Sequence, residues 1–219
     1  MPKVAVILSG CGVYDGTEIH EAVITLLALD RAGATVVCAA PNVDQTHVID
    51  HLTGGVVEGA RRNVLVESAR IARGKIVDLA TLDARTLDAA VFPGGYGAAK
   101  NLCDWAFKQD ACQVHPEVAR LVTDLHAARK PLGFVCITPV LAARALAGAH
   151  PQLTIGNDKD TAASVERMGG RHVACAVRDI VVDRERKIVS TPAYMLAGRI
   201  SEAAEGIERL VKAVLELCA

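Results

Sequence analysis

Short apolar segments alternate with helical patterns along this chain, and that alternation limits its fold more than any other feature. The apolar segments span residues 3–8, 35–40, 87–92 and 131–135. Continuous apolar runs of this length are typical of strands that are buried on both faces of a sheet. Strands alternating with helices predict an α/β fold, namely a flavodoxin-like, doubly wound, mostly parallel sheet with helices on both faces.

Other segments complete this pattern over one expected domain, residues 1–219, whose 51% hydrophobic content is enough to bury a sizeable core. The long polar stretch between residues 40 and 87 is expected to hold a small insertion or an edge hairpin. Apolar spacing, capping residues and turn signals predict helices at 17–33, 63–73, 116–125, 139–147 and 200–215, and strands at 152–155, 180–183 and 188–191.

Composition and charge narrow the class of protein. Lys and Arg total 24 against 25 Asp and Glu, so a net charge of -1 gives no field that would gather nucleic acid or anionic lipid. No apolar run reaches the roughly 20 residues that cross a bilayer, and the first residues lack the pattern of a secretory signal. Seven cysteines without CxxC spacing indicate reduced thiols. We therefore expect a cytoplasmic protein with no nucleic-acid or membrane partner.

Cys136 is the candidate nucleophile. Open α/β sheets bind ligands beyond the carboxyl ends of their strands, where the loops 9–17, 93–100 and 136–139 carry unusual residues. Cys136 follows a buried strand directly and a helix begins at Pro139, so the thiol is lifted from the core as at a nucleophile elbow. The helix N-terminus is expected to favour the thiolate. The alternative is a cysteine that merely packs as a small hydrophobe.

The glycine-rich loop after residue 92 is the second element of the candidate site. Gly94 and Gly95 expose backbone N–H groups that can closely approach a small ligand or a developing oxyanion. The amide of Ile137 would supply a second donor. A plain tight turn explains the same glycines, and only their pairing with Cys136 favours a site.

Two carboxylates at the start of the first helix are the third element. Glu18 and Glu21 are three residues apart and therefore lie on roughly one face. Pairing with the helix dipole explains at least one of them, and the other can abut the thiol. No nucleotide, phosphate-loop or HExxH motif occurs, so we expect no cofactor and no metal. We expect no catalytic role for the remaining candidates, which are His20, His126, His172, Cys11 and the acidic loop 157–160.

Five segments together resemble the ThiJ/PfpI superfamily, which has the class I glutamine amidotransferase-like fold. They span residues 6–16, 51–54, 93–102, 131–139 and 191–196, and so cover nearly the whole chain. Within that superfamily the chain is most similar to the ElbB-like group, the glyoxalase-like proteins associated with isoprenoid biosynthesis. The resemblance implies a homodimer.

The resemblance also implies roles for individual residues. A glutamate of the first helix meets the elbow cysteine, and counting back from the end of that helix places it at Glu21, with Glu18 as the alternative. The amides of Gly95 and Ile137 form the oxyanion hole. Contact between thiol and carboxyl makes a coupled pair in which the carboxyl is protonated. Further neighbours of the site are Gly94, Cys11 and Lys100.

One departure separates this chain from the proteases of the superfamily, which carry a histidine directly after the cysteine. Ile137 occupies that position, and losing the base argues against amide cleavage by the usual triad. The expected function is therefore cofactor-independent conversion of a small aldehyde, glyoxal or methylglyoxal, with water to a 2-hydroxy acid. Two alternatives stay open: a protein deglycase at the same site, and a non-enzymatic redox-sensing or regulatory protein associated with isoprenoid biosynthesis.

Overall fold

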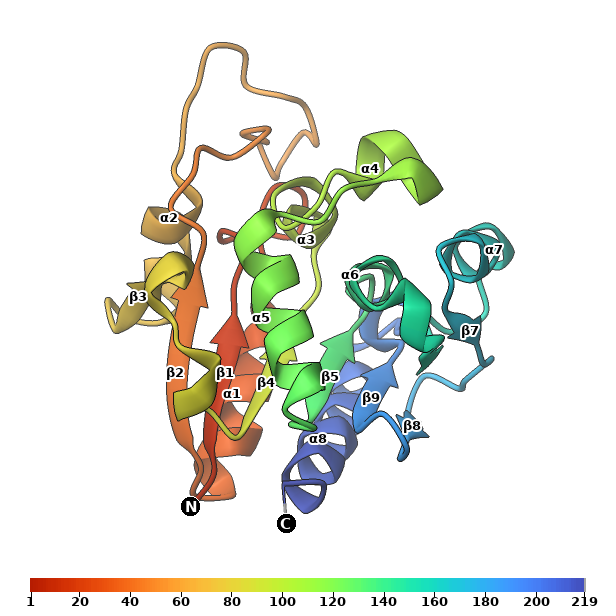
Figure 1. The fold of residues 1–219 in the computed structure, drawn as a ribbon. Helices are drawn as coiled ribbons and strands as arrows, with labels where there is room; N and C mark the ends of the chain where they lie inside the picture. The colour runs from red at the N-terminus through yellow and green to blue at the C-terminus, as the bar shows by residue number, and fades with distance from the viewer. Residues whose placement is uncertain (219) are drawn as a thin grey trace.

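A computed structural model describes residues 1–218, and its centre is one seven-stranded sheet (Figure 1). Its strands are β1 (Lys3–Ile7), β2 (Thr35–Ala40), β3 (Ile76–Asp78), β4 (Ala89–Phe92), β5 (Leu132–Val135), β8 (Val181–Asp183) and β9 (Ile188–Thr191). They lie in the order β3-β2-β1-β4-β5-β9-β8 and run parallel, except that β8 pairs with β9 antiparallel. The expected flavodoxin-like α/β fold is confirmed.

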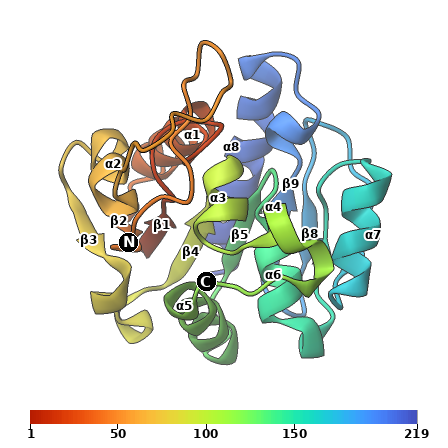
Figure 2. The same ribbon diagram turned by 90° about the horizontal axis from the view of Figure 1, so that it is seen from above.

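Helices cover both faces of this sheet (Figure 2). They are α1 (Ile19–Arg31), α2 (Val64–Ile71), α3 (Tyr96–Lys100), α4 (Trp105–Lys108), α5 (Pro116–Ala127), α6 (Pro139–Ala145), α7 (Lys159–Arg167) and α8 (Ile200–Glu216). Helices α1, α2 and α8 pack on one face, and α5 and α6 on the other. Within residues 1–218, no helix is long and apolar enough to cross a membrane.

Burial on both faces explains the continuous apolar run of β1. Val4 and Val6 join the core beneath α1 and α8, whereas Ala5 and Ile7 join the core beneath α5 and α6. All four side chains are fully buried. A strand in this position has no polar face, so its sequence shows no alternation.

The crossover of the chain determines where a site can form. From β1 the chain builds β2 and then β3 on one side, and it returns to place β4 on the other side of β1. A crevice opens beyond the carboxyl ends of the strands where the connections reverse in this way. The loops that follow β1, β4 and β5 are neighbours at that edge, above the strands in Figure 1.

The structure decides between the two expectations for the long polar stretch, which holds a small insertion. The sheet edge is not a hairpin, because β3 pairs parallel with β2 through Cys38 and Ile76. Residues 41–63 instead make an excursion closed by two isolated antiparallel bridges, Asp44 to Asn63 and Ile49 to Val56. This excursion is the loop that rises above the sheet in Figure 1.

Two other short segments also differ from the expectation. The segment 152–155 contributes only β6 (Gln152–Leu153), which pairs with β7 (Arg171–His172) in a separate two-stranded sheet. The glycine-rich loop contains the short helix α3, whose amide at Gly97 donates to the carbonyl of Gly16 at 2.8 Å. That contact comes from a distant loop, so the local sequence does not reveal it.

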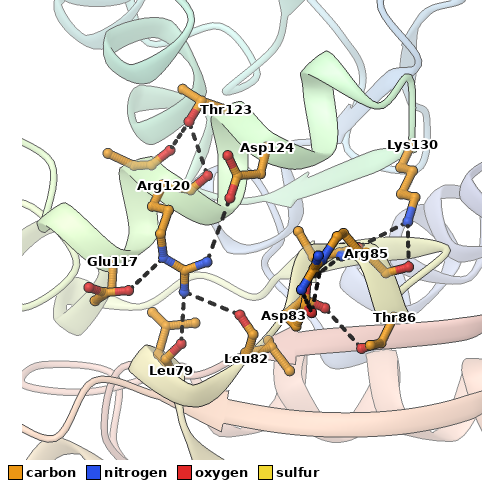
Figure 3. Close-up of polar contacts among 12 residues, drawn as sticks. Leu79, Leu82, Asp83, Arg85, Thr86, Glu117, Arg120, Thr123, Asp124 and Lys130 are labelled. Atoms are coloured by element: carbon orange, nitrogen blue, oxygen red, sulfur yellow. Dashed lines mark hydrogen bonds and ion pairs between the residues drawn. The ribbon is translucent and has the colours of Figure 1, made fainter.

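Cationic side chains fasten α5 and its following turn to the connection between β3 and β4 (Figure 3). The guanidinium of Arg120 donates to the carbonyls of Leu79 and Leu82, both at 3.2 Å, and to Glu117 at 2.7 Å. The ammonium of Lys130 donates to the carbonyl of Ala84 at 2.9 Å. These bonds satisfy carbonyls at the two short 3₁₀ helices, Leu79–Thr81 and Ala84–Thr86, that make up most of this connection.

Candidate active site

The three loops predicted to meet do come together at the carboxyl edge of the sheet. Glu18, which caps α1, donates its amide to the carbonyl of Gly94 at 2.9 Å. The amide of Tyr96 donates to the carbonyl of Val13 at 2.8 Å. Backbone hydrogen bonds therefore hold the loops after β1 and β4 together beside the elbow that follows β5.

The elbow holds Cys136 in a left-handed backbone conformation, with φ of 63°. Such a conformation is unfavourable for a residue with a side chain and persists only where the surroundings fix it. Here the Cys136 amide donates to the carbonyl of Thr191 at 2.9 Å. The buried Thr138 hydroxyl accepts from the Val135 amide at 2.8 Å and donates to the carbonyl of Phe92 at 2.9 Å. These bonds hold the thiol at the end of the sheet.

Glu21 is the carboxyl that contacts this thiol. Its side chain is fully buried and hydrogen-bonded to Cys136. Oε2 accepts from the amide of Gly94 at 2.8 Å, and Oε1 accepts from the amide of Tyr194 at 3.2 Å. A Cβ on Gly94 would lie 2.5 Å from the Cβ of Cys136 and 2.6 Å from Oε2 of Glu21. Glycine is thus required for thiol and carboxyl to pack against this loop.

Burial dominates the titration of this pair. Loss of solvation, followed by the negative charge of Glu18, raises the pKa of Glu21 to about 8. Loss of solvation and the charge of Glu21 raise the pKa of Cys136 well above its ordinary value. The amides of Gly95 and Ile137 do act to lower the pKa of Cys136, as expected at this elbow, but burial and Glu21 outweigh them, so the expected thiolate is not favoured overall. The carboxyl is mostly protonated near neutral pH, and a standing thiolate is disfavoured.

Two amides nevertheless converge on the sulfur. The N–H groups of Gly95 and Ile137 both donate hydrogen bonds to the Cys136 side chain and act to lower its pKa. A Cβ on Gly95, where φ is 98°, would lie 2.3 Å from the amide nitrogen of Glu18. Only glycine can bring its amide this close, and the two donors can serve a negative charge that develops on an atom bonded to the sulfur.

A cavity of about 390 Å³ opens above Cys136. Its wall is mainly apolar, with polar groups at a few points. It is lined by Val13, Glu18, Gly95, Tyr96, Ala99, Trp105, Ala106, Gln109, Cys136, Ile137, Thr161, Tyr194 and Met195. A concave apolar pocket with a few converging polar groups is the usual form of a small-molecule site.

The three further neighbours that the resemblance implied lie outside this cavity lining. Gly94 nevertheless packs against Cys136 and Glu21, whereas Cys11 and Lys100 lie farther from the thiol. Cys11 is half-buried, and its pKa is raised by burial and by Glu67, a residue of α2. The ammonium of Lys100 donates to the carbonyl of Tyr14 at 3.0 Å. Both side chains therefore support the loops around the site and do not face the cavity.

Several cavity residues were not anticipated from the sequence. Tyr194 lies in a segment singled out only for its resemblance, yet its amide holds Glu21. Trp105 and Met195 form apolar wall, and the indole N–H of Trp105 donates to the hydroxyl of Ser164 at 2.9 Å. The one sequence feature that could have indicated this wall is that Trp105 is the single tryptophan of the chain. Within residues 1–218, no cluster of three or more His, Cys, Asp or Glu side chains is suited to hold a metal ion.

Comparison with known proteins defines the family. No family model matches the chain. A human protein named glutamine amidotransferase-like class 1 domain-containing protein 3, mitochondrial, is 49% identical over 98% of this chain and 83% of its own length. The chain belongs to this glutamine amidotransferase-like family. The rat ES1 protein homolog, mitochondrial, is 48% identical over 98% of this chain and 84% of its own length.

Solved structures agree with this assignment. An isoprenoid biosynthesis protein with an amidotransferase-like domain from Ehrlichia chaffeensis is 38% identical and superposes with a TM-score of 0.93, each chain being fully covered. A ThiJ/PfpI domain protein from Brachyspira murdochii is 15% identical with a TM-score of 0.59, covering 98% of this chain and 96% of that one. The latter likeness shows the fold alone. The predicted relationship to class I glutamine amidotransferase-like proteins is confirmed.

The names of these relatives contradict the expected cytoplasmic location. Both mammalian proteins are named as mitochondrial. Unpaired cysteines argue against an oxidising compartment, but they do not separate the cytosol from another reducing one. The seven unpaired cysteines therefore do not by themselves identify the compartment.

Proposed function

We propose that this protein is a cofactor-independent glyoxalase that converts glyoxal and water to glycolate. One observation carries the proposal: the Cys136 thiol contacts the buried Glu21 carboxyl, receives two amide hydrogen bonds and opens onto an apolar cavity. A nucleophile, an adjacent proton carrier and two oxyanion donors are the groups that addition to an aldehyde requires.

In the first step the Cys136 sulfur bonds to one aldehyde carbon. The ionised fraction of Glu21 takes the thiol proton, and the carbonyl electron pair moves to oxygen. The amides of Gly95 and Ile137 stabilise that oxyanion until Glu21 returns the proton to it. The product is a hemithioacetal, and Glu21 is again ionised.

In the second step the same carboxylate moves a proton between the two carbons. Glu21 removes the hydrogen of the carbon bonded to sulfur, which gives an enediolate, and it then protonates the neighbouring carbon. The hydroxyl proton on the sulfur-bearing carbon passes to the neighbouring oxygen, which leaves a thioester next to a hydroxymethyl group. A carboxyl with a pKa of about 8 is a stronger base than an ordinary carboxylate. Hydrolysis of the resulting thioester on Cys136 releases glycolate and restores the thiol.

The electrostatics favour this enzyme over the redox-sensor alternative. Cysteine oxidation proceeds through a thiolate that is present before the oxidant arrives. The raised pKa of Cys136 disfavours that standing thiolate. A catalyst needs the deprotonated sulfur only during attack, when Glu21 can accept the proton.

The test is glycolate formation from glyoxal, followed by proton NMR with metal-free protein. We compare wild type with Cys136→Ala and with Cys38→Ala, a matched control at a buried cysteine of β2. Wild type and Cys38→Ala should turn over, and Cys136→Ala should not while remaining folded. Equal turnover by Cys136→Ala would contradict the proposal. A wild type that instead released amine from a purified adduct, with free aldehyde scavenged, would be a deglycase.

A further inference from the structure

A second group of titratable side chains faces the cavity and has no part in the chemistry described above. Glu18 and Tyr194 both line the cavity. The Nδ1 atom of His20 lies 2.8 Å from the hydroxyl oxygen of Tyr194 and 3.9 Å from Oε1 of Glu18. The imidazole is about half exposed, so this group joins the cavity to solvent.

We propose that Glu18 is the general base for the water that hydrolyses the Cys136 thioester, and that the Tyr194–His20 pair carries the released proton to solvent. This inference rests on the proposed glyoxalase function. It assigns the two carboxyls at the start of α1 to different steps. Glu21 transfers the proton between the two substrate carbons, and Glu18 deprotonates the water that hydrolyses the thioester.

Glu21 is poorly placed to activate water. Its side chain is fully buried, and both of its oxygens already accept backbone amides, from Gly94 and Tyr194. It is not among the residues that line the cavity. Glu21 therefore serves atoms that become bonded to the sulfur it contacts, whereas Glu18 lines the cavity through which water would enter.

Glu18 is better placed than Glu21 to activate a water molecule in the cavity. Its Oε2 accepts the amide of Glu21 at 2.7 Å, which caps α1 and fixes the carboxyl. Its Oε1 has His20 beyond hydrogen-bond distance at 3.9 Å, and Glu18 is one of the residues that line the cavity. Of the residues that line the cavity, Glu18 is the one with a carboxyl group. A positioned carboxylate within reach of a water is a general base.

The proposed step balances in atoms and charge. Glu18 takes one proton from water as the water oxygen bonds to the thioester carbon, and the carbon–sulfur bond then breaks. The second water proton passes from the new carboxyl group to the Cys136 sulfur, leaving glycolate and a thiol. Glu18 gives its proton to solvent through Tyr194 and His20.

The decisive variant is Glu18→Gln, because the glutamine oxygen can still accept the amide that caps α1. With glyoxal, this variant should lose about a hundredfold or more of its turnover and accumulate a thioester on Cys136. Hydroxylamine cleaves a thioester to a hydroxamate, which can be quantified, whereas a hemithioacetal yields only the oxime of the released aldehyde. Wild-type turnover by the variant, or an adduct that yields no hydroxamate, would overturn the assignment.

His20→Ala gives a second measurement that does not depend on the α1 cap. Thioester hydrolysis should slow, and added imidazole should restore it, because the missing ring is half exposed. His150→Ala, at an exposed histidine outside the cavity lining, is the matched control and should match wild type. No effect of His20→Ala would refute the proton route. A wild type without glycolate formation would instead refute the proposed function itself.

Discussion

The buried Glu21 predicts a specific dependence of stability on pH. Below about pH 4.5 the folded and unfolded chains both hold its proton; above that pH only the folded chain does, until about pH 8. Stability should therefore fall across this window as pH rises. At about 1.4 kcal/mol per pH unit, the rise in pKa from 4.5 to about 8 corresponds to a loss of roughly 4 to 5 kcal/mol.

Glu21→Gln should remove this loss because the amide does not titrate. The variant gives up one buried hydrogen bond, since its NH₂ group cannot accept from Gly94, at a cost of about 1–3 kcal/mol at every pH. The variant should thus be less stable than wild type near about pH 5 and more stable near about pH 8.

Urea unfolding of both proteins across this pH range measures the difference directly. Glu67→Gln is the control: it changes another buried glutamate, which pairs with Arg70 at 2.9 Å, and should keep the wild-type slope because Glu21 is intact. Parallel curves for wild type and Glu21→Gln would refute the conclusion that Glu21 is held protonated by burial.

Two further predictions concern the scaffold. Thr138→Val should destabilise the fold by about 1–3 kcal/mol in urea unfolding, because the buried amide of Val135 loses its acceptor; unchanged stability would mean that the elbow does not depend on this hydroxyl. Arg120→Met should lower stability by about 1–2 kcal/mol, since two carbonyls lose a charged donor. The exposed Arg85→Met is its control, and an equal drop in melting temperature for both would contradict the role given to Arg120.

The main architecture was predictable because its signals are local. The runs that became β1, β4 and β5 are buried on both faces, as is the second half of β2, and they read as continuous apolar segments. Helix α8 shows its buried face in the spacing of Ile207, Leu210 and Val214. The three-residue strand β3 escaped notice because so short a segment has no periodicity to detect.

The chemistry of the site was less predictable because it depends on contacts between distant segments. The elbow cysteine and the carboxyls of α1 could be proposed from strand ends and helix starts. The titration of Cys136 could not, because burial is a property of the folded chain. The amide of Tyr194 donates to Glu21, which lies 173 residues away in the chain, and no local sequence pattern near either residue predicts that hydrogen bond.

The central claim is that an aldehyde bonds to Cys136, and competitive alkylation tests it most directly. In wild type, where Glu21 can take the thiol proton, an excess of glyoxal should hold a share of Cys136 as covalent adducts and slow the alkylation of Cys136 by iodoacetamide. The half-buried Cys11 and Cys175 serve as internal controls and should alkylate at unchanged rates. Peptide mass spectrometry reads all three thiols in one sample. Protection confined to Cys136 supports the account, and absent or uniform protection would contradict it.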